Sequence, residues 1–295
     1  MALRIITDSA TDMPMQVREE YGFEVIPTPV VINGVDYLDG ETIMPSQFYC
    51  MLRDEINDIK TYHVNQYMFR NAFEPYAKRG DSLIYFCFST GIAGTYNAAN
   101  LAKRELLEDY PEFDLTIIDG KCASIGFGIL VYYAAQMLKN GADKDTIVKA
   151  AEYHRDYIEH FFTVETLDYL YRGGRLSRTS AFAGGLLDLK PIITVTDDGS
   201  LQAIEKVRGR RKSLNRLVEI VGEHGINLEN KTIGIVHGDC RDVLDDIKEM
   251  LTEKYGCTKF LENYVGCAIG AHTGPGIIGI TFLGGDSPYS EYFEY

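Results

Sequence analysis

Short apolar runs alternate with longer amphipathic segments along most of the chain, and this alternation restricts the possible folds more than any other feature. The runs read LRIIT, FEVIPTPVVI, SLIYFCF, DLTIID, PIITV, TIGIV and GIIGITFL. Segments between them, such as QYMFRNAFEPYAK and CASIGFGILVYYAAQMLKNG, repeat apolar residues at the spacing of amphipathic helices. Strands that alternate with helices predict an α/β fold with largely parallel sheets.

The character of the chain changes near residues 160 to 165. A long helical pattern gives way there to FFTVETLDYLYRGGRLSRTSAFAGGLLDLKPIITV, in which two Gly-Gly pairs interrupt the helical spacing. We therefore expect residues 1–162 to form an N-terminal α/β domain around a mainly parallel sheet, and residues 163–295 to form a C-terminal α/β domain. No Pro-rich or Ser-rich linker separates the two, which predicts closely apposed domains with a cleft between them.

The charge balance narrows the class of partner. With 29 Lys and Arg against 43 Asp and Glu, the formal net charge is -14 at pH 7, which repels nucleic acid and anionic membrane surfaces. No run approaches the roughly 18 apolar residues of a membrane span, so we expect neither a signal peptide nor an integral membrane anchor. The six cysteines show no C-x-x-C pair and no zinc-ligand spacing, which predicts free thiols in the cytoplasm and no metal.

The stretch SLIYFCFSTGIAGTYNAANL passes from an apolar strand directly into a helix. Backbone N–H groups and the positive end of the helix dipole converge at such a corner. Ser89, Thr90 and Thr95 add hydroxyls, while Gly91 permits close approach to the backbone. The pattern fits an anion site and ordinary helix capping equally well. It contains no Walker loop, dinucleotide fingerprint or nucleophile elbow, so binding is favoured over phosphoryl transfer by this chain.

Three further segments place polar residues next to predicted strand ends. ITDSATDMP contains Asp8, DIKTYHVNQYMF contains Thr61 and His63, and CAIGAHTGPGIIGITF contains His272. For the first two segments, helix capping explains the polar residues as well as a ligand site does. A titratable ring in a turn rich in glycine makes His272 a candidate for ligand contact.

Two basic clusters stand out against the acidic composition. YRGGRLSR contains Arg172, Arg175 and Arg178, and KVRGRRK contains Arg208 among five basic residues. Such runs are usually solvated surface, but on an acidic protein they also suit a carboxylate, a phosphate or an acidic partner protein.

The chain resembles the DegV family, whose members include the fatty-acid-binding subunits (FakB type) of bacterial fatty acid kinase. Seven pieces carry the resemblance, in family order from end to end: IITDSATDMP, IKTYHVNQYMF, FSTGIAGTYNAA, IIDGKCASIGFG, LDYLYRGGRLS, LLDLKPII and HTGPGIIGI. The resemblance covers essentially the whole chain, and it implies two α/β domains with one long-chain fatty acid in a tunnel between them.

The resemblance also implies roles for individual residues. Thr61, Ser89 and Thr90 would bind the carboxylate of the fatty acid, with backbone N–H groups near Gly91. His272, Arg172 and Arg208 match family positions near the head group or facing the kinase. The implied protein carries the fatty acid to a separate kinase, which forms an acyl phosphate, and it has no catalysis or cofactor of its own.

The chain departs from the family pattern directly after Thr61. Members commonly read T-S-Q-P-S there, whereas this chain reads TYHVN, so that Tyr62, His63 and Val64 replace Ser, Gln and Pro. Two other functions remain open on the residues alone. One is an enzyme that acts on a small anion with His272 as its acid or base. The other is a lipid transport module without a kinase.

Overall fold

The N-terminal part of the protein is built around a parallel sheet of four strands. The computed structural model describes residues 2–54, 56–177 and 188–293. The sheet has the order β2-β1-β6-β7, with β1 at Leu3–Asp8, β2 at Glu24–Ile26, β6 at Ser82–Cys87 and β7 at Leu115–Asp119. All three strand pairs are parallel, which confirms the mainly parallel first sheet.

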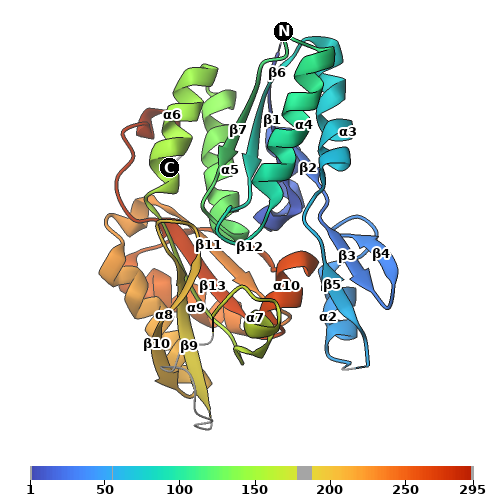
Figure 1. Cartoon of the computed structure of the whole chain (residues 1–295). Helices are drawn as coiled ribbons and strands as arrows, with labels where there is room; N and C mark the ends of the chain where they lie inside the picture. The colour runs from blue at the N-terminus through green and yellow to red at the C-terminus, as the bar shows by residue number, and fades with distance from the viewer. Residues whose placement is uncertain (1, 55, 178–187, 294–295) are drawn as a thin grey trace.

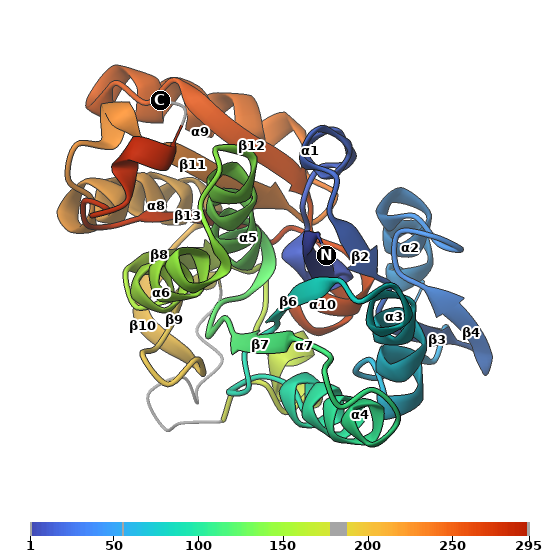
Figure 2. The ribbon, with the colours of Figure 1, turned by 90° about the horizontal axis from the view of Figure 1, so that it is seen from above.

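Helices cover both faces of this sheet. α3 (Gln66–Arg79) and α4 (Thr95–Asp109) pack on one face, and α5 (Ser124–Lys139) packs on the other, next to α1 (Met15–Tyr21) and α6 (Lys144–Arg155). The view from above shows this layering, with α3 and α4 across β6 and β7 from α5 and α6 (Figure 2). Short 3₁₀ turns lie at Ser9–Thr11, Leu228–Asn230 and Ser290–Tyr292.

A small antiparallel sheet projects from this part. Its order is β4-β3-β5, with β3 at Pro29–Ile32, β4 at Val35–Leu38 and β5 at Ile59–Thr61, and α2 (Pro45–Leu52) packs beside it. The apolar run FEVIPTPVVI therefore forms two strands in two sheets. Proline at 27 and 29 lacks the backbone donor of a sheet ladder and separates them.

The C-terminal part contains a mixed sheet of six strands in the order β10-β9-β8-β13-β11-β12. The strands are β8 (Ile158–Thr163), β9 (Leu189–Val195), β10 (Leu201–Arg208), β11 (Thr232–His237), β12 (Lys259–Tyr264) and β13 (Ile278–Leu283). Its helices are α7 (Asp168–Arg172), α8 (Arg210–His224), α9 (Asp242–Tyr255) and α10 (Cys267–Thr273). Figure 1 shows this sheet below the parallel sheet, with α10 between it and the small sheet.

The expectation of parallel strands is wrong for this second sheet. The β11–β12 pair is parallel, while β8–β9, β9–β10, β8–β13 and β11–β13 are antiparallel. β9 and β10 are antiparallel because a short turn connects them, whereas parallel neighbours need a long crossover. All six residues of β8 belong to this sheet, so residue 162 lies inside a strand. The division of the chain into domains stays a prediction.

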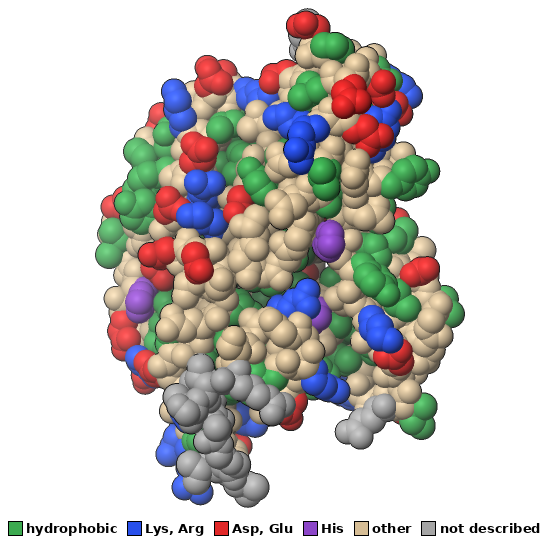
Figure 3. Space-filling view, in the orientation of Figure 1, with side chains coloured by type: hydrophobic (Ala, Val, Ile, Leu, Met, Phe, Trp, Pro, Cys, Tyr) green, Lys and Arg blue, Asp and Glu red, His purple; other side chains and the backbone are tan. Residues whose placement is uncertain are grey.

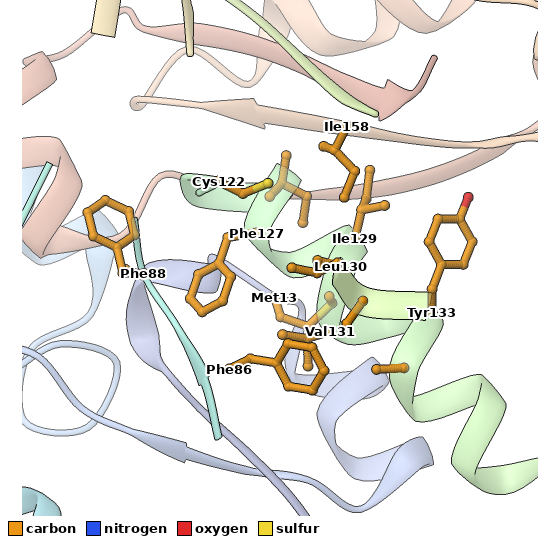
Figure 4. Packing of buried hydrophobic residues seen from close by; sticks show 14 of the residues in the cluster. Met13, Phe86, Phe88, Cys122, Phe127, Ile129, Leu130, Val131, Tyr133 and Ile158 are labelled. Atoms are coloured by element: carbon orange, nitrogen blue, oxygen red, sulfur yellow. The ribbon is translucent and has the colours of Figure 1, made fainter. Parts of the chain in front are cut away.

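α5 lies between the two large sheets and joins their cores. Its sequence is apolar on every side, which is typical of a helix buried all round. Phe127 and Val131 point toward Phe86 of β6, and Ile158 of β8 lies on the opposite side of the helix (Figure 4). No helix among the described residues has the length and apolar character needed to cross a membrane.

Candidate functional site

A narrow cavity lies between the carboxyl ends of β1 and β6 and one face of the six-stranded sheet, and α10, β5 and the loop after α7 complete its wall. Its volume, counted out into the open mouth, is about 990 Å³. Figure 3 shows a hollow near the middle of this face, with basic and histidine side chains at its edge.

Most of the wall is apolar. The larger apolar side chains come from elements of both large sheets and from α10, and they include Ile92, Phe162, Leu170, Leu201, Ile269 and Ile277. Polar side chains also line the cavity but expose little surface to it, which is the usual composition of a pocket that buries the body of a ligand and orients it through a small number of contacts.

Thr61 and His272, both predicted from the sequence, meet in this wall. Thr61 ends β5, and His272 lies in the last turn of α10. Thr61 Oγ1 and His272 Nε2 are 2.7 Å apart, a hydrogen bond between residues 211 positions apart. The structure thus brings together two residues that belong to separate sequence motifs.

His272 is held as a neutral imidazole. Burial and, to a smaller extent, the nearby charge of Arg175 together lower the pKa of His272 to about 4. The ring packs directly on the backbone at Gly173, where an added Cβ would lie 2.2 Å from Nδ1. Nδ1 itself is buried, and no described residue is its hydrogen-bond partner. The contact with Thr61 is therefore the one hydrogen bond that orients this ring among the described residues.

Arg175 contributes a cationic group to the same wall. It is half-buried, burial lowers the pKa of its guanidinium, and Nη1 donates a 2.6 Å hydrogen bond to the carbonyl of Gly173. The sequence placed Arg175 in a basic cluster but did not single it out as a site residue. Its position follows from the turn after α7, which points it back toward His272.

Thr95 is the hydroxyl of the strand–helix corner that faces the cavity. It is the first residue of α4, is only 4% exposed and lines the cavity, and its side chain has no hydrogen-bond partner within the part of the chain that the structure describes. The N-cap residue Gly94 supplies no side-chain hydrogen bond to the helix. The positive end of a helix of 15 residues therefore points to the cavity beside an unoccupied hydroxyl.

The hydroxyl of Ser89 is engaged elsewhere. Ser89 is fully buried, and its Oγ donates a 2.7 Å hydrogen bond to the carbonyl of Gly199 in the turn between β9 and β10. Gly91 packs on the same turn, since an added Cβ would lie 2.5 Å from the carbonyl carbon of Gly199. Neither residue lines the cavity, so their predicted contact with a carboxylate stays a prediction.

Thr90 lies on the outside of the corner. It is exposed, and its Oγ1 donates a 2.5 Å hydrogen bond to Asp119 at the end of β7, while its backbone N–H donates to the same carboxylate at 3.2 Å. The structure does not place Thr90 beside Thr61 and His272.

The two predicted arginines also lie outside the cavity wall. Arg172 is exposed at the end of α7 and stacks on the ring of Tyr169 at 4.6 Å. Arg208 is exposed at the end of β10, paired in register with Leu189. It lies seven residues from Leu201 of the cavity wall, roughly 23 Å along an extended strand. Arg178 lies outside the described residues.

The departure from the family pattern shapes the mouth of the cavity. Tyr62 and His63 line it and are exposed, whereas Val64 is buried in the core under α3. The ring of His63 lies against Gly94, at 3.5 Å from the position of an added Cβ. Thr61 and His63 project to the same side of an extended chain, so this contact brings the end of β5 next to the start of α4.

This arrangement suits an amphipathic anion. Hydroxyls at Thr61 and Thr95, the N–H groups at the start of α4 and the guanidinium of Arg175 are donors to an oxyanion, and an apolar passage extends from them. Among the described residues, no group of three or more His, Cys, Asp or Glu side chains has the arrangement of a metal site.

Comparison with known proteins gives consistent matches over nearly the full chain. Residues 2–284 match the family model described as uncharacterised proteins of the DegV family. A DegV domain-containing protein of Clostridium perfringens is 40% identical over 282 residues, which cover 95% of this chain and 97% of that protein.

Solved structures of similar proteins share the fold. A DegV family protein from Thermus thermophilus, described by its fatty acid binding, is 27% identical with a TM-score of 0.86 over 96% of this chain and 100% of its own. DegV of Bacillus subtilis, described as a fatty acid binding protein, is 28% identical with a TM-score of 0.85 over 97% of this chain and 100% of its own. The α/β architecture, the ordered motifs and these matches agree: the chain belongs to the DegV family.

Proposed function

We propose that this protein binds one long-chain fatty acid and presents its carboxylate to a separate kinase, which converts it to an acyl phosphate. The observation that carries the proposal is the narrow apolar cavity with the hydrogen-bonded pair Thr61 and His272 in its wall. The similarity to solved DegV proteins that are described as binding fatty acids supports it.

The carboxylate lies between Thr61 and Thr95 in this proposal. If His272 Nε2 donates to Thr61 Oγ1, the hydroxyl hydrogen of Thr61 is free to donate to the ligand. Thr95 and the N–H groups at the start of α4 then serve the second oxygen. Arg175 adds a positive charge near the same place, so that the carboxylate is bound in its ionised form.

The acyl tail supplies most of the affinity. Each buried methylene group contributes about 0.8 kcal/mol, so a tail of many methylenes outweighs the few polar contacts of the head group. The polar contacts orient the ligand instead, because a carboxylate needs paired donors to leave water.

The same geometry suits delivery to a kinase of the FakB type. Neutral hydroxyl donors hold a carboxylate less tightly than a bidentate arginine fork, which leaves an oxygen available to attack a phosphoryl group. In this proposal, the exposed Arg172 and Arg208 contact the acidic surface of the kinase or the phosphates of its nucleotide. Catalysis resides in the partner, and both proteins work in the cytoplasm.

A binding titration with a matched variant pair tests the proposal. Delipidated protein should bind oleate at one site per chain, and Thr61→Val, which replaces the hydroxyl by a methyl group of similar size, should bind about ten-fold more weakly because one charge-assisted hydrogen bond is lost. Thr61→Ser keeps the hydroxyl and should bind like the wild type. Equal binding by Thr61→Val and the wild type would reject the proposed head-group position.

A further inference from the structure

Helix α10 carries His272 in its last turn, yet its first turn is capped by side chains that lie far away in the sequence. Its N-cap residue, Gly266, provides no side-chain hydrogen bond. Asp39 instead accepts hydrogen bonds from the backbone N–H groups of Cys267 at 2.9 Å and Ala268 at 3.2 Å. Asp12 accepts one from Gly266 at 2.9 Å. These bonds satisfy three of the N–H groups that a helix start leaves unpaired.

Gly266 is required for this double cap. An added Cβ at position 266 would lie 2.7 Å from Asp12 Oδ1 and 2.8 Å from Asp39 Oδ2. Both carboxylates therefore reach the start of α10 only because residue 266 has no side chain. Asp39 and Asp12 are buried beside the positive end of the α10 dipole, and burial raises the pKa of both carboxyl groups.

The small antiparallel sheet holds α10 at both ends. Asp39 directly follows β4, and Thr61 ends β5 of the same sheet. Asp39 binds the first residues of α10, and Thr61 binds His272 in its last turn. Figure 1 shows α10 beside the small sheet and α2. The position of α10 against this sheet thus determines whether the Thr61 and His272 side chains meet.

We propose that Asp39 is a positioning residue for His272, which acts by fixing the start of α10 against the small sheet and so sets the contact between His272 and Thr61. This role explains the contacts of Asp39, to which the proposed ligand contacts assign no function. The effect of Asp39 on the His272 ring is independent of the proposed function, whereas its consequence for fatty-acid binding rests on that function.

Every hydrogen-bond partner of the Asp39 carboxylate is a donor. Oδ1 accepts from Cys267, and Oδ2 accepts from Ala268 and, at 3.4 Å, from the hydroxyl of Ser9. Burial raises the pKa of Asp39, while the hydrogen bonds from Cys267 and Ala268 oppose that rise. An asparagine at this position would turn an N–H group toward an N–H group of α10, so Asp39→Asn keeps the volume but loses a cap bond.

Asp12→Asn is the matched control. Asp12 Oδ1 accepts from Gly266, and Oδ2 accepts from the hydroxyl of Ser124. An asparagine there still accepts from Gly266 through its oxygen and donates to the Ser124 hydroxyl, which can also act as an acceptor. The same acid-to-amide change at the same helix start therefore leaves the cap intact.

The test follows the ring of His272 by long-range ¹H–¹⁵N NMR during a pH titration, with His154 as an internal reference for folding. The resonance of His272 is assigned with His272→Gln. In Asp39→Asn the pKa of His272 should move from about 4 toward the ordinary value of 6.5, and oleate should bind about ten-fold more weakly. Asp12→Asn should match the wild type in both measurements.

Gly266→Ala serves as the second variant if Asp39→Asn does not fold, because it keeps both acidic residues but displaces their carboxylates from the start of α10. It should raise the pKa of His272 in the same way. An unchanged His272 tautomer and titration in a folded Asp39→Asn or Gly266→Ala protein overturns the inference. If the wild type itself binds no fatty acid, the proposed function fails while the NMR comparison still decides the role of Asp39.

Discussion

Ser89 Oγ donates a 2.7 Å hydrogen bond to the carbonyl oxygen of Gly199, which joins the corner between β6 and α4 to the turn between β9 and β10. The hydroxyl that its sequence motif assigns to a ligand therefore links the two large sheets in this structure. An added Cβ at Gly199 would lie 2.1 Å from Ser89 Oγ, so these two segments of the chain are in close contact.

Replacement of Ser89 by alanine should lower the free energy of unfolding. The change leaves the buried carbonyl of Gly199 without its donor, and a lost buried hydrogen bond costs about 1–2 kcal/mol. Thr90→Ala removes a hydrogen bond at an exposed residue and should cost less than about 0.5 kcal/mol. Urea denaturation of both variants measures the difference, and a larger loss for Thr90→Ala would contradict this role of Ser89.

A methyl group at position 173 should displace His272. Gly173 has an ordinary helical φ of -72°, so alanine introduces no backbone strain, but its Cβ would lie 2.2 Å from His272 Nδ1. We expect Gly173→Ala to weaken oleate binding about ten-fold through loss of the contact with Thr61. Gly285→Ala, whose Cβ would touch Tyr157 at an ordinary 3.4 Å, is the control and should bind normally. Normal binding by Gly173→Ala would show that the ring position is unimportant.

Arg175 and Arg172 should differ in their effects, although they lie three residues apart. Arg175→Gln removes a charge from the cavity wall and should weaken oleate binding about ten-fold. Arg172→Glu should leave oleate binding unchanged, because Arg172 is exposed on Tyr169, and it should slow kinase-coupled phosphorylation in a manner that depends on salt. Calorimetry measures oleate binding, and a coupled assay measures phosphorylation by the kinase. Weaker oleate binding by Arg172→Glu together with normal binding by Arg175→Gln would contradict the proposed head-group position.

Acid should destabilise the protein through buried neutral histidines. Burial lowers the pKa of His154 to about 4, so the folded state resists the proton that the unfolded chain binds below about 6.5. The contribution of His154 is therefore complete above pH 6.5 and is lost as the pH falls toward 4. The effect of pH on stability is opposite for Asp8. Burial raises its pKa to about 6, so the stability that its protonated form contributes is lost as the pH rises through 6.

A difference measurement isolates His154 from Asp8. The stability of the wild type relative to His154→Gln should fall by about 2 kcal/mol between pH 7 and pH 4.5. Urea denaturation at several pH values provides the comparison. A difference that does not vary with pH would mean that His154 has the same pKa in the folded and unfolded states, which would contradict the neutral buried ring.

The sequence predicted the parts of the fold that local patterns determine. The strand runs of β1, β6 and β7 predicted a parallel sheet, and Thr61 and His272 were found as polar residues next to strand ends. The segment of α5 was predicted as an amphipathic helix, and its burial between two sheets was missed because that depends on tertiary packing. The antiparallel pairing of the second sheet was missed, because strand direction depends on which strands become neighbours, and β13 lies between β8 and β11 from distant parts of the chain.

The site could be predicted only where a residue type was informative by itself. Ser89 and Thr95 both looked like ligands of an oxyanion, and only the position of Gly199, 110 residues after Ser89, separates a structural hydroxyl from one open to the cavity. Asp39 gave no signal, because its role depends on the start of a helix 228 residues away.

Extraction of lipid from protein purified under native conditions tests the central claim most directly. Mass spectrometry of the extract identifies the lipid, and native mass spectrometry of the intact protein should give about one long-chain fatty acid per chain. Thr61→Val protein prepared in parallel should retain less fatty acid. A protein that carries no acyl ligand and takes up none from oleate, or that holds a small polar anion in its place, would contradict the account.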